Sequence, residues 1–142
     1  MFDISLLIVE DDSIISSIFE RVLSKYVKKI YTAGNGQEGL DKYLKLSPDL
    51  ILTDIKMPIM NGLDMISEIR YSDTEVRILI MSAYGESRYF LNAIESGVKG
   101  FLTKPIKNEE LIRIVSEQAN DILLEKKLKE EEKKRKIAEK EL

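Results

Sequence analysis

Short apolar runs alternate with longer segments of helical periodicity along most of the chain. Three runs, at 6–9, 50–53 and 78–81, are almost entirely apolar, which is typical of parallel strands covered on both faces. Two further runs, at 29–33 and 100–103, complete a set of five predicted strands. The run at 29–33 is the more polar of the two, and we expect it to form an edge of the sheet.

A helical pattern follows each predicted strand, with apolar residues recurring at spacings of three and four. These residues are Ile15, Ile18, Phe19, Val22, Leu23 and Tyr26; Leu40, Tyr43 and Leu44; Leu63, Ile66 and Ile69; Phe90, Ala93 and Ile94; and Leu111, Ile112, Val115 and Ala119. Gly97 predicts a left-handed end to the fourth helix. Asn108, followed by two glutamates, predicts the capped start of the fifth.

Five strand–helix pairs in strict alternation predict an α/β fold, a doubly wound parallel sheet with helices on both faces. Crossovers between parallel strands are almost always right-handed, which leaves few topologies. We expect the flavodoxin-like (βα)5 arrangement with strand order 2-1-3-4-5, because that order brings the chemically notable residues together. The predicted domain covers residues 1–122, and residues 123–142 form a charged helical extension.

Length and charge fit a single compact domain. The chain has 142 residues and a formal net charge of −3. Residues 125–142 carry eight Lys/Arg and six Asp/Glu, a net +2, so residues 1–124 carry −5. This balance gives no electrostatic reason to expect nucleic-acid binding.

The chain contains neither cysteine nor histidine. Disulfides, thiolate catalysis, serine-hydrolase triads and most zinc sites are therefore excluded. Any histidine that carries phosphate must belong to a partner. No apolar run is long enough to cross a bilayer and the first residues lack the pattern of a signal peptide, so we expect a cytoplasmic location and no membrane partner.

Polar residues follow four of the predicted strands at the point where each strand ends. Glu10 and Asp11 follow the first, Asp54 the third, Ser82 the fourth and Lys104 the fifth. The carboxyl ends of parallel strands meet at one edge of a sheet, where ligands bind. Clustered carboxylates favour a hard cation, either Mg²⁺ or Mn²⁺, and an added hydroxyl and ammonium suit phosphoryl transfer to a carboxylate.

Four motifs resemble those of bacterial response-regulator receiver domains. They are LIVEDD at 7–12, LTDIKMPIMNG at 52–62, IMSA at 80–83 and FLTKP at 101–105. The resemblance covers residues 4 to about 120, in the right order and spacing. Each motif alone is weakly specific, but the four together on one predicted edge are highly specific.

The resemblance implies a magnesium-dependent phosphoacceptor site. Asp54 matches the residue that is phosphorylated. Asp11 matches the acid that ligates Mg²⁺ directly, and Glu10 the acid that acts through water. Lys56 occupies the position whose backbone carbonyl ligates the metal.

The resemblance also implies a switch. Ser82 and Phe101 match the hydroxyl and aromatic switch pair, and Lys104 matches the lysine of the family, whose bond to Pro105 is typically cis. Phe101 lacks the hydroxyl of the tyrosine that many members carry there. We further hypothesise that Tyr84 screens the acyl phosphate from water.

Simpler interpretations exist for several of these residues. Asp12 and Ser13 suit a helix cap, Asp54 alone suits a turn, and Phe101 alone suits the core. Met57-Pro58 and Asn61-Gly62 are most simply turn residues. Three acids after one buried strand, and one acid after another, favour the metal-site interpretation.

The implied function is that of a two-component receiver, which takes a phosphoryl group from a sensor histidine kinase or histidine phosphotransfer protein and catalyses only its own phosphorylation and dephosphorylation. One alternative is a phosphorylation-independent scaffold that dimerises through the C-terminal helix. Another is an aspartate-nucleophile phosphatase, which usually carries Asp-x-Asp after its first strand and a cap domain. This sequence shows neither feature.

The C-terminal extension permits two interpretations. Positions 124, 128, 131, 135, 138 and 142 follow a four–three rhythm, but Glu131 and Arg135 interrupt its apolar seam. A solvated extension of the fifth helix and a dimerising stalk are both open. We expect that the extension leads to an output domain, whose identity the sequence does not indicate.

Overall fold

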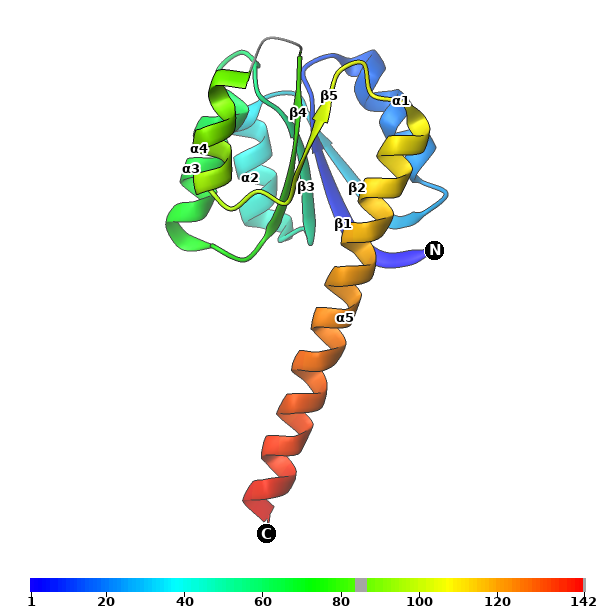
Figure 1. The fold of residues 1–142 in the computed structure, drawn as a ribbon, viewed down its shortest axis with the longest axis vertical. Helices are drawn as coiled ribbons and strands as arrows, with labels where there is room; N and C mark the ends of the chain where they lie inside the picture. The colour runs from blue at the N-terminus through cyan, green and yellow to red at the C-terminus, as the bar shows by residue number, and fades with distance from the viewer. Residues whose placement is uncertain (84–86, 142) are drawn as a thin grey trace.

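A computed structural model describes residues 1–83 and 87–141 as a parallel five-stranded sheet with helices on both faces (Figure 1). The strand order is β2-β1-β3-β4-β5, as predicted, with the more polar β2 at one edge. The strands are β1 (Phe2–Val9), β2 (Val27–Ala33), β3 (Leu50–Asp54), β4 (Arg77–Ser82) and β5 (Gly100–Thr103). All neighbouring pairs are parallel.

The helices divide between the two faces of the sheet. They are α1 (Ser13–Leu23), α2 (Gly36–Leu46), α3 (Gly62–Ser72), a 3₁₀ turn (Ser87–Tyr89), α4 (Phe90–Glu95) and α5 (Asn108–Glu141). Helices α1 and α5 cover one face, and α2, α3 and α4 cover the other (Figure 1).

The sheet separates two hydrophobic cores. Successive side chains of a strand point to opposite faces. In β1, Leu6 and Ile8 pack under α1 and α5, whereas Leu7 and Val9 pack under α2, α3 and α4. All four are fully buried, which explains why this strand is apolar without alternation.

Side-chain caps set where the helices begin. Asp12 Oδ1 accepts the backbone N–H groups of Ile14 and Ile15 at 2.9 and 3.2 Å, so the predicted cap of α1 is confirmed. Gly97 has φ of 71°, which confirms the left-handed end of α4. Helix α5 begins at Asn108, with the carbonyl of Lys107 accepting the Leu111 N–H.

Some residues predicted for apolar helix faces are exposed. Helix α1 ends at Leu23, so Tyr26 lies in the turn before β2. The exposed fractions of Ile18, Leu44 and Ile94 are 40%, 65% and 60%. A three–four spacing fixes which residues share a side of a helix but not the centre of the buried stripe, and these three lie on its flanks.

Helix α5 continues without a break for 34 residues and projects beyond the sheet (Figure 1). Its buried residues, Leu111, Val115, Ala119 and Ile122, all lie in the first half. Within the described residues, no helix combines the length and the apolar character that crossing a membrane requires.

Candidate functional site

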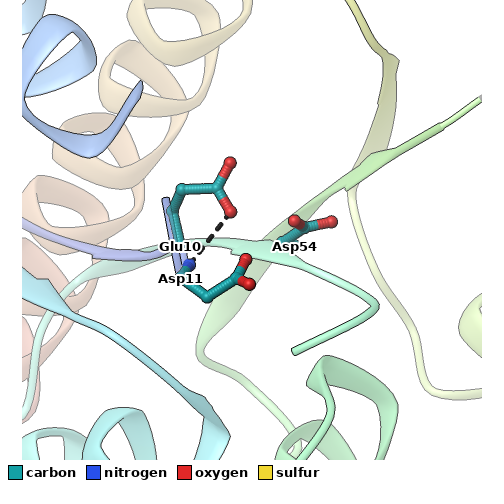
Figure 2. A group of neighbouring side chains, drawn as sticks. All are labelled: Glu10, Asp11 and Asp54. Atoms are coloured by element: carbon teal, nitrogen blue, oxygen red, sulfur yellow. Dashed lines mark hydrogen bonds between the residues drawn. The ribbon is translucent and has the colours of Figure 1, made fainter. Parts of the chain in front are cut away.

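The ends of β1 and β3 bring three carboxylates together. The register pairs Val9 with Thr53, so the residues that follow each of them, Glu10 and Asp54, are neighbours. Ligand oxygens of Glu10, Asp11 and Asp54 all lie within 4.8 Å of one another (Figure 2). The structure therefore confirms that these three acids lie together at one edge of the sheet, as the sequence predicted.

Two of these acids are buried and one faces solvent. Glu10 is 2% exposed and Asp54 is 5% exposed, whereas Asp11 is exposed. Burying carboxylates is costly unless they are paired. The arrangement sets the solvent-exposed Asp11 beside two buried carboxylates, so the cluster can be reached from solution on the Asp11 side.

Lys104 supplies the paired cation. Its Nζ lies 2.6 Å from Asp54 Oδ2 and 3.1 Å from Glu10 Oε1. Backbone N–H groups satisfy the other oxygens: Ile55 donates to Asp54 Oδ1 at 2.8 Å, and Asp11 donates to Glu10 Oε2 at 3.1 Å (Figure 2). The Asp54 carboxylate is thus held in one orientation from both sides.

The charges at the site perturb one another. Burial, together with the neighbouring Asp54 carboxylate, raises the pKa of Glu10 from 4.5 to about 7, although Lys104 opposes the shift. For Lys104, burial lowers the pKa, but the bonds to Asp54 and Glu10 outweigh it and raise the pKa above its ordinary value. One ammonium therefore does not balance the three carboxylates.

This imbalance fits a divalent cation. All of the side-chain donors in the cluster are carboxylate oxygens, which are the ligands that Mg²⁺ prefers. A second positive centre would offset both the burial and the repulsion from Asp54 that raise the pKa of Glu10. The residues present fit the metal that receiver domains bind at their acidic site.

Ser82 and Lys104 lie beside the acids at the ends of the next two strands. Asp54 pairs with Met81, so Ser82 follows one residue later on β4, and it is 1% exposed. The Lys104 backbone N–H donates to the carbonyl of Ser82 at 2.8 Å. The predicted cis bond between Lys104 and Pro105 is present.

Two more predicted residues lie in the described part of the chain, one just after β3 and one in β5. Lys56 is exposed, two residues beyond Asp54. Phe101 is half-buried on the edge strand β5, opposite Ile80, and packs against the core beneath α2, α3 and α4. Tyr84 lies outside the described residues.

Two further residues shape the site, and sequence reasoning did not assign them this role. Thr53 is fully buried, and its hydroxyl donates to the carbonyl of Asp54 at 2.9 Å. A Cβ on Gly62 would lie 2.0 Å from that same carbonyl oxygen. The pairing Asn61-Gly62 signals a turn, but a close approach to Asp54 is visible only in three dimensions.

Comparisons with known proteins agree with this geometry. The response regulator receiver domain model matches residues 6–116. The chemotaxis protein CheY of Thermotoga maritima is 33% identical over 111 residues, which are 78% of this chain and 92% of that protein. Sporulation initiation phosphotransferase F of Bacillus subtilis is 32% identical over 111 residues, 78% of this chain and 90% of that protein.

A solved structure is similar over most of the chain. The N-terminal domain of an uncharacterised protein from Wolinella succinogenes is 34% identical, with a TM-score of 0.81, and the match covers 86% of this chain and 98% of that one. The fold and the acidic strand ends define a receiver-type regulatory domain. The chain belongs to the response regulator receiver domain family of two-component signalling.

Proposed function

We propose that Asp54 accepts a phosphoryl group from a phosphohistidine of a partner protein. The observation that carries the proposal is the position of Asp54, buried at a strand end with Lys104 Nζ 2.6 Å from Oδ2 and two more carboxylates beside it. The partner is a sensor histidine kinase or a histidine phosphotransfer protein. This chain has no histidine of its own to fill that role.

The transfer exchanges one bond to phosphorus for another. An oxygen of Asp54 forms the new P–O bond, the P–N bond to the partner's imidazole breaks, and the electron pair of that bond leaves with the imidazole nitrogen. The product is an acyl phosphate on Asp54. The chain catalyses only its own phosphorylation and dephosphorylation, so its role is regulatory.

The metal ligands of the proposal are Glu10, Asp11, Asp54 and the backbone carbonyl of Lys56. They would hold Mg²⁺, with Mn²⁺ as an alternative. When bound, the metal supplies charge neutralisation for the phosphoryl oxygens. Asp11, as the exposed member of the cluster, is the acid that an incoming ion meets first.

Lys104 and Ser82 complete the catalytic residues of the proposal. The Lys104 ammonium is already aimed at Asp54, so it can remain beside the phosphoryl group without a large movement. Ser82 offers a hydroxyl from the adjacent strand. A rearrangement of Ser82 together with Phe101 then alters the surface near α4, β5 and α5, which shifts an existing equilibrium between two states.

Intact-mass spectrometry after incubation with acetyl phosphate and Mg²⁺ tests the proposal. We expect one adduct of about 80 Da on the wild-type chain, no adduct on Asp54→Asn, and loss of the adduct when EDTA is present. Asp41→Asn is the matched control, because Asp41 is an exposed aspartate on α2. An adduct that survives Asp54→Asn but disappears in Asp41→Asn would overturn the assignment.

A further inference from the structure

The last part of α5 carries apolar side chains that nothing in the described structure covers. Leu124 and Leu128 are 57% and 56% exposed, although the helix is continuous from the domain to Glu141. The first turn of this segment contacts the domain through Glu125, Lys126 and Lys129, and the helix then projects beyond the sheet (Figure 1). Ile137 is also exposed, at 51%, but it lies on another side of the helix, whereas Leu124 and Leu128 share one side.

The exposed leucines face away from the domain. Ile122 is buried, Lys126 lies 2.7 Å from Asp49, and Lys129 lies 3.5 Å from Glu75, so these three positions mark the side of α5 that meets the domain. At 3.6 residues per turn, Leu124 lies about half a turn and Leu128 about a third of a turn round the helix from that side. A second helix can therefore reach them without meeting the domain.

The spacing of this outer side is that of a coiled coil. Residues 124, 128, 131, 135 and 138 alternate steps of four and three, which assigns them to the core positions d, a, d, a and d of a heptad. Glu131 and Arg135 interrupt the apolar core, but they occupy successive layers and carry opposite charges. In a parallel pair, Glu131 and Arg135 each face their own copy within a layer, and Glu131 of one chain lies one layer away from Arg135 of the other.

The flanking charges select the direction of pairing. The e positions are Glu125, Glu132 and Glu139, and the g positions are Lys127, Lys134 and, in the last turn of the segment, Glu141. In a parallel pair, each g residue contacts the e residue five places later on the other helix, so Lys127 meets Glu132 and Lys134 meets Glu139. An antiparallel pair would instead set e against e and g against g, which places glutamates against glutamates and lysines against lysines.

The lysines are available for such contacts. Within residues 1–83 and 87–141, Lys127 makes no ion pair inside its own chain. Lys134 has one partner, Glu130, at 3.9 Å, and both side chains are at least 70% exposed. Exchanging so weak a pair for a contact between helices costs little.

We propose that residues 124–141 pair in parallel with the same segment of a second copy of this chain. The occupant is a second copy because each helix presents both halves of the charge pattern. The extension leaves the domain at the amino ends of the strands, the end opposite Asp54 (Figure 1). Pairing therefore leaves the phosphoacceptor site open and sets the two C-terminal ends side by side.

Cysteine cross-linking tests the seam, because the chain has no native cysteine. Leu128→Cys places a thiol at a core position. The matched control is Lys133→Cys, which lies on the same side of the helix as the residues that contact the domain in the preceding turns. Under mild oxidation we expect a disulfide-linked dimer of Leu128→Cys and little of the Lys133→Cys dimer. Equal cross-linking of the two variants would overturn the proposal.

The same thiols test the direction of pairing. In a parallel pair, Leu128→Cys and Ala138→Cys each cross-link with themselves, and a mixture gives few mixed dimers. An antiparallel pair about the middle of the segment would bring position 128 next to position 138 of the other chain. Predominantly mixed dimers would therefore overturn the parallel arrangement.

Charge reversal at the e and g positions tests whether their charges hold the two helices together. Self-association of the full chain is measured by sedimentation equilibrium. Lys127→Glu with Lys134→Glu should weaken self-association about tenfold or more, and adding Glu132→Lys with Glu139→Lys should restore it. Lys133→Glu with Lys140→Glu makes the same change in net charge away from the seam. If that control weakens association equally, or if the wild-type chain stays monomeric at all concentrations, the proposal fails.

Discussion

Asp54 owes its orientation to backbone groups as much as to charged side chains. Ile55 N–H and Lys104 Nζ hold its two carboxylate oxygens, while the Thr53 hydroxyl bonds its carbonyl. Gly62 lets α3 begin directly against that carbonyl, and its N–H donates to the carbonyl of Ile55 at 2.7 Å. The position of the carboxylate therefore depends on a residue that carries no chemistry itself.

Gly62→Ala should damage both stability and the site. The added Cβ would lie 2.0 Å from the Asp54 carbonyl oxygen, a backbone atom that cannot move independently. We expect a loss of roughly 2 kcal/mol in the free energy of unfolding and slower adduct formation with acetyl phosphate. Urea unfolding and time-resolved mass spectrometry measure the two effects.

Gly34→Ala is the control for that prediction. The nearest atom to its added Cβ is Glu38 Oε2 at 3.4 Å, the far end of an exposed side chain. We expect little change in unfolding or in phosphorylation. An equal loss in both variants would mean that the close contact at Gly62 is not the cause.

A polar contact ties two helices together on the α2–α4 side of the sheet. The Tyr43 hydroxyl of α2 donates to Asp73 Oδ2 at 2.5 Å, and Asp73 directly follows α3. Burial and the bond to Asp73 raise the pKa of Tyr43 to about 12. Burial alone would raise the pKa of Asp73, but the Tyr43 hydroxyl, two backbone N–H groups and Arg70 hold it below its ordinary value.

Tyr43→Phe should lower the free energy of unfolding by about 1 kcal/mol near neutral pH, because it leaves Asp73 without its hydroxyl donor. A depressed Asp73 pKa stabilises the folded state above the ordinary pKa of 3.8, and this is lost as pH falls through the folded value. A raised Tyr43 pKa stabilises the folded state below pH 10, and this stabilisation is lost as pH rises through about 12. In a plot of the free energy of unfolding against pH, the variant should therefore flatten both the acid limb, which reflects Asp73, and the alkaline limb, which reflects Tyr43.

Urea unfolding as a function of pH checks the prediction, with Tyr71→Phe as control. Tyr71 is 95% exposed on α3, so losing its hydroxyl should change neither the midpoint nor the limbs. If Tyr43→Phe keeps the full acid limb of the wild type, Asp73 is stabilised by its other donors and the inter-helix bond contributes little.

The whole molecule divides into a packed domain and an exposed rod. Arg77 marks the junction, since its guanidinium contacts Gln118 Oε1 and Glu125 Oε2, both at 3.0 Å. Within the described residues beyond Glu125, α5 forms two ion pairs with the domain: Lys126–Asp49, in which the carboxylate is half-buried, and the exposed pair Lys129–Glu75. Exposed pairs of this kind contribute little to stability.

Truncation after Glu125 should therefore leave the domain intact. We expect the free energy of unfolding to change by less than about 1 kcal/mol and Asp54 to be phosphorylated at the wild-type rate. Self-association should be lost. Thermal unfolding, the acetyl phosphate assay and sedimentation separate these results, and unfolding of the truncated chain would show that the domain needs residues beyond Glu125.

The sequence by itself determined the element order, the parallel sheet and the set of acids at its carboxyl edge. Local pattern suffices for these, because a fully buried strand must be apolar and because side chains at parallel strand ends share an edge. The cap at Asp12 and the left-handed Gly97 follow from local backbone chemistry in the same way.

Only the tertiary structure decided the details that depend on distant segments. It determined which flank residues face solvent, as at Ile18, Leu44 and Ile94, because the neighbouring elements set the centre of each buried stripe. It also revealed that Gly62 abuts the Asp54 carbonyl and that Leu124 and Leu128 face away from the domain. These are contacts and directions in space, which no spacing along one segment specifies.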